Sequence, residues 1–276
     1  MLVIIFSLIA LAVSLIYFFA VRHAVLPVLI IFAVVFLALN LLFILILGVG
    51  ALFVNKKKPI KKQSGFCRVG CAAFASLFMS YFGVHSHVSG TEKLPSQGRF
   101  LFVCNHRSIF DPFIVIEKLD KYNISFISKP SNMKIPIVGN IAYGAGFLPI
   151  DRENDRKALR TVLRAVEYLK KDMCSIAVYP EGTRNRGGGL LPFHAGSFKI
   201  AQKAKVPVVV ACVRGTENVK KRFPFRATDV YMDILEVIPA EKVAELSSSQ
   251  LADYSSSLML SQLEAESGVS EEAEKE

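Results

Sequence analysis

The sequence contains no tryptophan, and its first 54 residues include neither an acidic residue nor a lysine. Arg22 and His23 are the only basic residues in that stretch. A segment so poor in charge cannot supply the water-facing surface of a soluble domain, where charged side chains are mostly found. The rest of the chain has an ordinary globular mixture, so the composition predicts a membrane anchor fused to a soluble-type domain.

Three chemical signatures are also missing. The five cysteines form no C-x-x-C pair, and Cys67 and Cys71 stand four apart on one face of an expected helix. This pattern indicates reduced, buried thiols and argues against a disulfide framework or a zinc site. The sequence has no G-x-S-x-G elbow and no G-x-x-x-x-G-K-[ST] loop, which argues against an α/β-hydrolase nucleophile and a P-loop.

Two long apolar runs, residues 2–21 and 27–54, fill the charge-poor segment. Each is long enough as a helix to cross a hydrocarbon core of ~30 Å. Because the link between them is short, we expect a helical hairpin. A cleaved signal peptide is the alternative for the first run, although this run lacks a basic start and a second run follows directly.

Five lysines follow the second run, within NKKKPIKK at 55–62. Since positively charged flanks stay in the cytoplasm, we expect the domain on the cytoplasmic side of the cell membrane or of another cytoplasm-facing membrane. The lysines either set topology alone or also pair with anionic headgroups. A net charge of +10 would fit a nucleic acid as well, but the apolar runs favour lipids or phosphate-bearing substrates as partners and no nucleic acid.

Strand and helix patterns alternate after residue 84, which predicts an α/β domain with a mostly parallel central sheet flanked by helices. We expect strands at 84–95, 99–106, 124–128, 175–182, 206–213 and 229–239. We expect helices at 112–119, 154–171 and 194–205, the second with Leu159, Val162, Leu163, Val166 and Leu169 on one face. Residues 66–82 fit either a third membrane-associated helix or a buried core helix.

These patterns divide the chain into three parts. Residues 1–62 form the anchor with its basic flank, and residues 63–247 form the α/β domain. Residues 248–276 form a tail that is first helical and then acidic and disordered.

The stretch NHRSIFDPF at 105–113 places a histidine and an aspartate five residues apart. His106 follows an apolar strand, and Asp111 with Pro112 predicts a helix N-cap with proline at the first helical position. In the chemical interpretation, His106 is a general base and Asp111 fixes its tautomer. In the alternative interpretation, Asp111 only caps the helix and His106 is a satisfied polar residue. A metal site that adds His85 and His87 is a third hypothesis.

A second polar group, YPEGTRNRGGG at 179–189, follows another buried strand. Backbone N–H groups and an arginine fork at such a turn can hold a phosphate. The candidate residues are Glu181, Gly182, Thr183 and Arg184. Arg152 and Lys129 end two further strands, so these cations either share one anion site or are separate solvated surface charges.

Four segments, NHRSIFDP, GFLPIDR, YPEGTR and VPVVVACV, together resemble the sequence blocks of the glycerolipid acyltransferase family. The resemblance is strongest to bacterial-type 1-acylglycerol-3-phosphate (lysophosphatidate) acyltransferases and covers about residues 88–238. Three residues depart from the family pattern, namely Arg107, Asn185 and His194. None occupies a core motif position, so they bear on acceptor preference more than on reaction type.

The resemblance implies transfer of an acyl group from acyl-CoA or acyl carrier protein to the free sn-2 hydroxyl of lysophosphatidate, giving phosphatidate at a membrane. It implies that His106 is the base and Asp111 its partner, with no metal and no cofactor beyond the acyl donor. The predicted substrate-binding residues are Asn105, Lys129, Arg152, Glu181, Gly182, Thr183 and Arg184. The apolar helices and the VPVV strand would border the acyl chain.

The sequence is also compatible with other functions. The acceptor could be glycerol 3-phosphate, another lysophospholipid or an acylated amine lipid. A membrane-anchored lipid-binding protein with a degenerate site and a metal-dependent phosphohydrolase are the alternatives from other classes.

Overall fold

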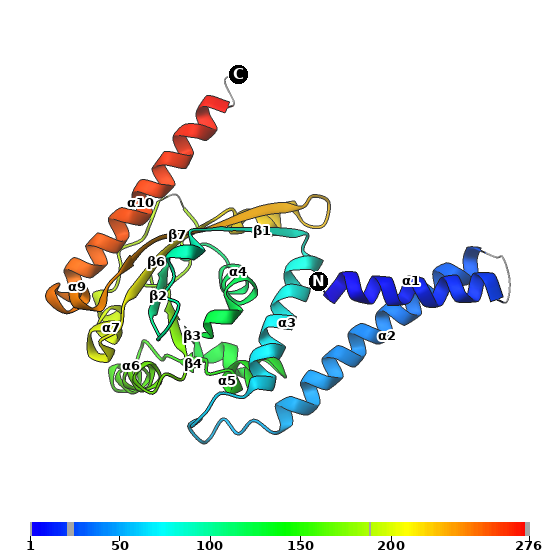
Figure 1. The fold of residues 1–276 in the computed structure, drawn as a ribbon, viewed down its shortest axis with the longest axis horizontal. Coiled ribbons are helices and arrows are strands. Elements are labelled where there is room, and N and C mark those ends of the chain that lie inside the picture. Colours follow the sequence, from blue (N-terminus) through cyan, green and yellow to red (C-terminus); the bar gives the residue numbers. More distant parts are fainter. Residues whose placement is uncertain (1, 21–24, 188, 274–276) are drawn as a thin grey trace.

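The computed structural model describes residues 2–20, 25–187 and 189–273. Helices α1 (Leu2–Ala20) and α2 (Val25–Leu52) lie side by side and project from the rest of the molecule (Figure 1). By length and composition both could cross a membrane. Their large side chains are mostly exposed, Ile16 to 68% and Leu45 to 61%, which a buried core helix would not allow. The expected hairpin is confirmed, and its link lies outside the described residues.

Helix α3 (Gly65–Tyr81) combines features of a buried core helix and of a membrane-associated helix, the two types expected for this segment. It begins at Ser64, whose hydroxyl accepts a hydrogen bond from the Cys67 backbone N–H, as an N-cap does. It buries one face, including Cys67, against the domain but exposes Phe66, Val69 and Tyr81. The Tyr81 hydroxyl donates a hydrogen bond to Asn40 of α2. This helix therefore joins the hairpin to the domain.

The domain is built on a mixed sheet with the order β1-β7-β6-β2-β5-β3-β4 in the described residues. Its strands are β1 (Val84–Ser89), β2 (Leu101–Cys104), β3 (Ile124–Ser128), β4 (Leu148–Pro149), β5 (Ser175–Val178), β6 (Val208–Arg214) and β7 (Thr228–Ile238). Only the β6–β7 pair is antiparallel among these strands. The expected mostly parallel sheet is confirmed.

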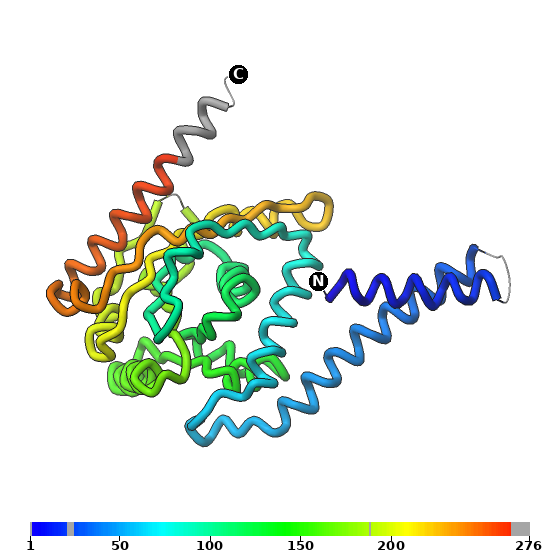
Figure 2. The backbone as a smooth tube through the Cα atoms, in the orientation of Figure 1, coloured from blue at the N-terminus to red at the C-terminus, as the bar shows by residue number. Residues whose placement is uncertain are grey.

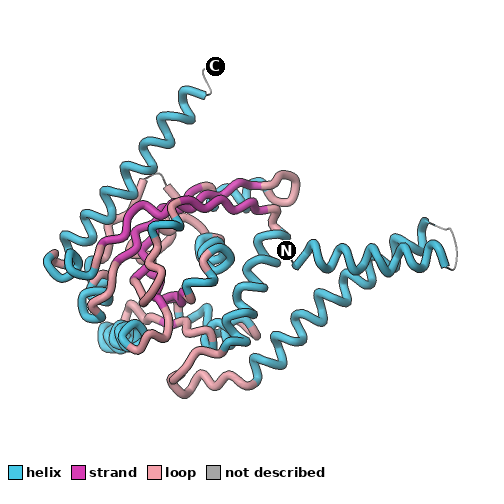
Figure 3. Tube along the Cα trace, viewed as in Figure 1, coloured by secondary structure: helices cyan, strands magenta, loops and turns pink. Residues whose placement is uncertain are grey.

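Helices cover both faces of the sheet, as the cyan helices around the magenta strands show (Figure 3). They are α4 (Asp111–Lys118), α5 (Val138–Gly144), α6 (Asp155–Lys170), α7 (Lys199–Ala204), α8 (Val219–Arg222), α9 (Ala240–Glu245) and α10 (Ser248–Ala273). Short 3-10 turns connect them, among them η1 (Thr91–Lys93), η2 (Asp120–Tyr122), η3 (Pro130–Lys134), η4 (Ala195–Ser197) and η5 (Thr216–Asn218).

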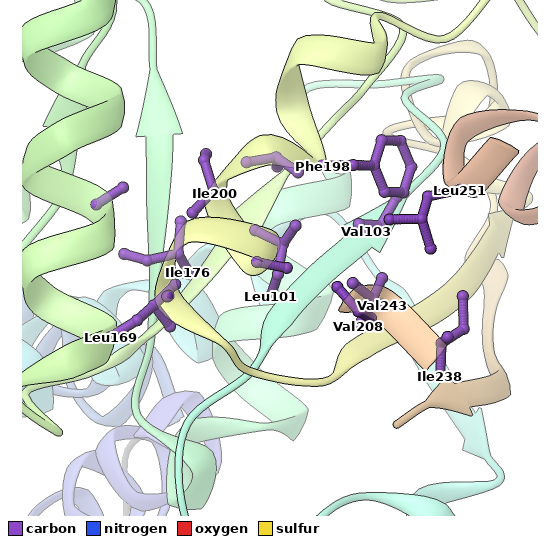
Figure 4. Close-up of a cluster of buried hydrophobic side chains, with 14 of the residues drawn as sticks. Leu101, Val103, Leu169, Ile176, Phe198, Ile200, Val208, Ile238, Val243 and Leu251 are labelled. Carbon is purple, nitrogen blue, oxygen red and sulfur yellow. The ribbon is translucent and has the colours of Figure 1, made fainter. Parts of the chain in front are cut away.

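The period-2 alternation of β2 divides the core into two layers. Leu101 and Val103 join α6, α7, α9 and α10 in one cluster, which Figure 4 shows around Phe198 and Ile200. Phe102 and the next alternate residue, Cys104, pack on the other face with α3 and α4. Because both faces of β2 are covered, all four of its residues are buried and its sequence is a continuous apolar run.

Several expected boundaries and faces differ from the structure. Leu159 and Leu163 of α6 are 54% and 50% exposed, because Ala165 and Tyr168 occupy the buried face with Val166 and Leu169. The expected helix over 194–205 is divided into η4 and α7. In Figure 2, α10 lies along the side of the domain opposite the hairpin, and its first part, with Leu251 and Met259, packs on the core. It stays helical to Ala273, where a disordered acidic end was expected, and residues 274–276 lie outside the described part.

Candidate active site

The carboxyl ends of β2 to β6 meet at one edge of the sheet, because these five strands run parallel. Ligands of open α/β sheets bind at that edge. The loops that follow these strands carry His106, Lys129, Arg152, Glu181 and Thr216. The fold therefore brings residues more than 100 positions apart to one side of the molecule.

His106 and Asp111 form a hydrogen-bonded pair, with His106 Nδ1 2.7 Å from Asp111 Oδ2. The backbone N–H groups of Arg107 and Ser108 donate to the same oxygen at 2.7 and 2.8 Å. Because a carboxylate only accepts hydrogen bonds, Nδ1 carries the ring proton and Nε2 is left as the basic atom. Asp111 therefore holds the loop before α4 in place by accepting hydrogen bonds from its backbone. The expectation that it is the helix N-cap was wrong, since Phe110 occupies that position.

The other oxygen of Asp111 is also occupied. The Thr216 hydroxyl, fully buried in the turn after β6, donates a hydrogen bond to Asp111 Oδ1. In the same turn, Glu217 pairs with Arg107 at 3.1 Å. Two contacts thus tie the loop after β2 to the turn after β6. Thr216 was not among the predicted site residues, because a hydroxyl at a strand end has no local sequence pattern that marks it.

Asn105 is completely buried and binds the neighbouring strand. Its Nδ2 donates to the Val213 carbonyl at 2.8 Å, and its Oδ1 accepts from the Val213 N–H at 2.7 Å. The side chain thus imitates a strand backbone and extends the pairing of β2 with β6. These hydrogen bonds support a positioning role and leave the predicted contact with substrate without support.

Glu181 is 3% exposed, and its carboxylate accepts two backbone hydrogen bonds. One comes from the His106 N–H at 2.6 Å and the other from the Leu191 N–H at 3.0 Å. Burial raises the pKa of Glu181, and these two hydrogen bonds act in the opposite direction. The predicted phosphate cradle therefore contains a carboxylate that holds the histidine backbone, and an anionic side chain cannot itself attract a phosphate.

Tyr179 stacks on the His106 ring, with centroids 4.2 Å apart and planes inclined by 18°. Its hydroxyl is buried and has no hydrogen-bond partner in the described residues. Burial, with Asp111 and Cys104 nearby, raises the pKa of Tyr179 well above its usual range. The phenol thus stays neutral and acts as a flat wall that fixes the plane of the imidazole.

Gly182 brings two basic side chains together beside the pair. Its φ of +72° is left-handed, which glycine adopts without strain. A Cβ there would lie 2.9 Å from His194 Nε2 and 3.3 Å from Arg152 Nη1. The structure thus places His194 next to Arg152, so one of the residues that depart from the family pattern lies at the predicted anion site.

The remaining predicted residues are exposed. Thr183 and Arg184 follow Gly182, and Lys129 follows β3. Within the described ranges, no ion pair engages Lys129, Arg152 or Arg184. These three cations are free to meet a solvent-borne anion.

The nearest thiol is not an activated nucleophile. Cys104 is completely buried two residues before His106, and burial raises its pKa well above the usual range. A thiol in that state stays protonated, whereas nucleophilic cysteines have lowered pKa values. The geometry therefore favours a base that activates a hydroxyl of a substrate.

The part of the chain that the structure describes contains no group of three or more His, Cys, Asp or Glu side chains that could hold a metal ion. His85 and His87 lie on β1, where their ring nitrogens are 3.8 and 2.8 Å from Asp229 Oδ1. His106 belongs to the loop after β2, with Asp111 as its partner. The structure thus pairs His85 and His87 of β1 with Asp229, and His106 of the loop after β2 with another carboxylate, Asp111.

Three comparisons with known proteins agree with one another. A family model described as "Acyltransferase" matches residues 85–214. The 1-acyl-sn-glycerol-3-phosphate acyltransferase of Salmonella typhimurium is 31% identical over 62% of this chain and 69% of its own length. The human protein named 1-acyl-sn-glycerol-3-phosphate acyltransferase beta is 31% identical over 65% of each chain.

A solved structure has the same fold. The crystal structure of the 1-acyl-sn-glycerophosphate (LPA) acyltransferase PlsC from Thermotoga maritima matches with a TM-score of 0.62 and 22% identity. The match covers 94% of this chain and 96% of that protein, so it includes the apolar N-terminal helices as well as the α/β domain.

Proposed function

Because this chain belongs to the acyltransferase family, we propose that it is a 1-acyl-sn-glycerol-3-phosphate O-acyltransferase. It transfers an acyl group from acyl-CoA or acyl carrier protein to the free sn-2 hydroxyl of lysophosphatidate, forming phosphatidate and a free thiol. The observation that carries the proposal is the hydrogen bond between His106 and Asp111, which leaves His106 Nε2 as the basic atom. Arg152, Arg184 and Lys129, which form no ion pair with a described residue, accompany this base. The names of the relatives support lysophosphatidate as acceptor.

The reaction needs no nucleophile from the protein. His106 Nε2 takes the proton of the substrate hydroxyl while that oxygen attacks the thioester carbonyl carbon. The tetrahedral intermediate then collapses, the C–S bond breaks, and the imidazolium returns its proton to the departing thiolate. Asp111 keeps Nδ1 protonated and stabilises the positive ring that forms between the two proton transfers.

The cations supply recognition of the acceptor. Arg152 and Arg184 are the proposed ligands of its phosphate, because an arginine fork matches two phosphate oxygens. Lys129 adds a point charge at the end of β3. His194, next to Arg152, is positioned to contact the acceptor headgroup and to influence which acceptor is preferred.

An apolar cavity of about 340 Å³ lies between α2 and α3 and is the proposed place for the acyl chain. Phe43, Phe74 and Phe78 are among the residues that line it. Phe78 also packs on Phe110 and Phe113, at the start of α4, with ring centroids 5.4 and 4.6 Å apart. Aromatic contacts therefore run from this cavity to the residue next to Asp111.

The hairpin would hold the site at the membrane that contains its lipid substrate and product. The lysines at 55–62 favour the cytoplasmic side for the domain. This topology is part of the proposal and agrees with the reduced state of the buried cysteines.

The test is acyl transfer by the purified full-length protein in detergent, with radiolabelled acyl-CoA and lysophosphatidate. Wild type is expected to form phosphatidate, and His106→Ala to lose ~10²–10⁴-fold in kcat. Transfer at the wild-type rate by a folded His106→Ala protein would refute the mechanism. The same assay with glycerol 3-phosphate, other lysophospholipids and acylated amine lipids, and with acyl carrier protein as donor, decides between acceptors and donors.

A further inference from the structure

The segment between β6 and β7 has a composition unlike the rest of the domain surface. Residues 219–226, which we call the docking loop, read VKKRFPFR and contain four cations, two phenylalanines and no acidic residue. The cations Lys220, Lys221, Arg222 and Arg226 are all exposed. Phe225 is 93% exposed, so its ring has almost no contact with the protein. An isolated exposed aromatic ring is ordinary, but one set among four cations marks a surface made for an anionic and partly apolar partner.

The charges of the docking loop are not neutralised by the protein. None of its cations forms an ion pair with a described residue. The nearest acidic residue along the chain beyond the loop, Asp229, has His87 Nε2 2.8 Å from its Oδ1. That contact is the main cause of the lowered pKa of Asp229, and Arg222 contributes least among the causes.

The docking loop is continuous with the apolar helices of the N-terminal part. Phe223 packs on Phe82 at the end of α3, with centroids 4.6 Å apart. The preceding residue, Tyr81, is hydrogen-bonded to Asn40 of α2. In Figure 1 the loop that joins β6 to β7 lies on the side of the domain from which α1 and α2 project. If α1 and α2 enter a bilayer, the docking loop therefore lies at its surface.

The lysine-rich segment at 55–62 lies at the opposite end of α3. Helix α3 has 17 residues, which corresponds to about 25 Å. Between the two basic segments it exposes Phe66 and Val69. Two cationic groups at the ends of a partly apolar helix would both contact one flat surface, as an interfacial helix with basic ends does.

We infer that the docking loop is a second membrane contact, in which Phe225 inserts at the headgroup level of a bilayer and the four cations bind anionic phospholipids. A phenyl ring favours the interface between headgroups and acyl chains. Basic residues near a membrane surface are attracted by anionic lipids, and salt weakens this attraction so that it is largely lost beyond a Debye length. The loop begins just after η5, whose Thr216 holds Asp111, so this contact lies beside the catalytic pair.

The absence of tryptophan provides a direct test in the full-length protein. The variant Phe225→Trp carries a single tryptophan at an exposed position. The matched control, Ser257→Trp, places it at an exposed position of α10. Figure 1 shows that helix on the other side of the domain from the hairpin. Both proteins are placed in lipid nanodiscs, whose two faces are open to solvent. The discs contain phosphatidylcholine alone or phosphatidylcholine with phosphatidylglycerol, each with or without brominated chains.

The expected result is specific to one probe and one lipid. In discs with phosphatidylglycerol, the tryptophan at 225 should emit at shorter wavelength, be quenched by brominated lipid and be several-fold less quenched by acrylamide. The tryptophan at 257 should be quenched by acrylamide in every disc. An acrylamide-accessible tryptophan at 225, unaffected by brominated lipid, would overturn the proposal and assign the loop to a soluble partner.

A second pair of variants tests the charges. In the Phe225→Trp protein, changing Lys220, Lys221, Arg222 and Arg226 to Gln should abolish the difference between the two disc types. The control changes four exposed lysines elsewhere, Lys170, Lys199, Lys203 and Lys205, to Gln and should keep that difference. Equal insertion in both discs by the unmodified loop would overturn the choice of anionic lipid. The readout follows the position of the loop and not turnover, so it does not depend on the proposed reaction.

Discussion

The two halves of the candidate site differ in how their polar side chains are satisfied. In the half around the histidine, Asp111 and Glu181 are buried, and backbone N–H groups donate to each carboxylate. In the other half, Lys129, Arg152 and Arg184 are exposed and have no ion pair within the described part of the chain. In the first half both carboxylates have their hydrogen-bond donors within the protein, and in the other half the cations have no counterion among the described residues.

This difference assigns separate tasks to the two halves. Groups that act in a transition state are most effective when they are held in place beforehand, because no energy is then used to reorganise them during the reaction. Groups that bind a charged substrate must first exchange water for the ligand, and exposure permits that exchange. We therefore expect changes in the buried half to lower kcat and changes in the exposed half to raise KM.

The largest effect is expected for Asp111→Asn. The amide oxygen can still accept from His106, Arg107 and Ser108, so the loop is kept while the negative charge is lost. The imidazolium then forms without its counterion, and kcat should fall by roughly 10³-fold or more. Steady-state kinetics with lysophosphatidate should show little change in KM. A raised KM with unchanged kcat would place Asp111 in the binding half and break the comparison.

The next largest effect is expected for Arg152→Ala. Loss of a charge-assisted hydrogen bond of about 1.5–3 kcal/mol corresponds to ~10–100-fold in kcat/KM. The loss should appear mainly in KM. The lysine variant should restore part of it, because lysine keeps the charge but lacks the fork.

A neutral acceptor provides the control for that prediction. Monoacylglycerol has the same hydroxyl chemistry without the phosphate, so Arg152→Ala should change its acylation by much less than that of lysophosphatidate. Equal losses on both acceptors would mean that Arg152 stabilises the site and does not bind phosphate.

A smaller effect is expected for Thr216→Val, which keeps the side-chain shape but removes the hydroxyl that donates to Asp111. Leaving a buried carboxylate oxygen without its donor lowers the free energy of unfolding by about 1–3 kcal/mol. We therefore expect a lower melting temperature and a kcat reduced by roughly tenfold. Thr216→Ser keeps the hydroxyl and should restore both quantities. Full activity of the valine variant, together with wild-type melting, would show that the second oxygen of Asp111 needs no partner.

Much of the buried half was predictable from the sequence because its signals are local. Apolar runs marked the central strands, and His106 and Asp111 are five residues apart in one loop. Thr216 was missed because its contact with Asp111 spans 105 positions. Asn105 was predicted to be a substrate ligand, and its hydrogen bonds with Val213 were not foreseen because that partner lies 108 positions away.

The buried face of α6 was predicted only in part, for a related reason. Periodicity selected its large aliphatic residues, including Leu159 and Leu163, but burial depends on which side of the helix meets the sheet. Ala165 and Tyr168 lie on that side and are buried although neither is a large aliphatic residue. Local pattern therefore identified the helix and part of its buried face, Val166 and Leu169, but not how far that face extends.

The smallest effect is expected for Lys129→Gln, which tests whether exposure alone is enough for a role in binding. Lys129 was predicted to bind substrate because it ends a strand, and no ion pair engages it within the described residues. A single exposed lysine contributes about 0.2–1 kcal/mol to an ion pair, so KM should rise by no more than ~5-fold, and less at high salt. A rise as large as that of Arg152→Ala, insensitive to salt, would mean that substrate closes the site around Lys129. The exposed half would then also become buried and paired during the reaction, as the carboxylates of Asp111 and Glu181 already are.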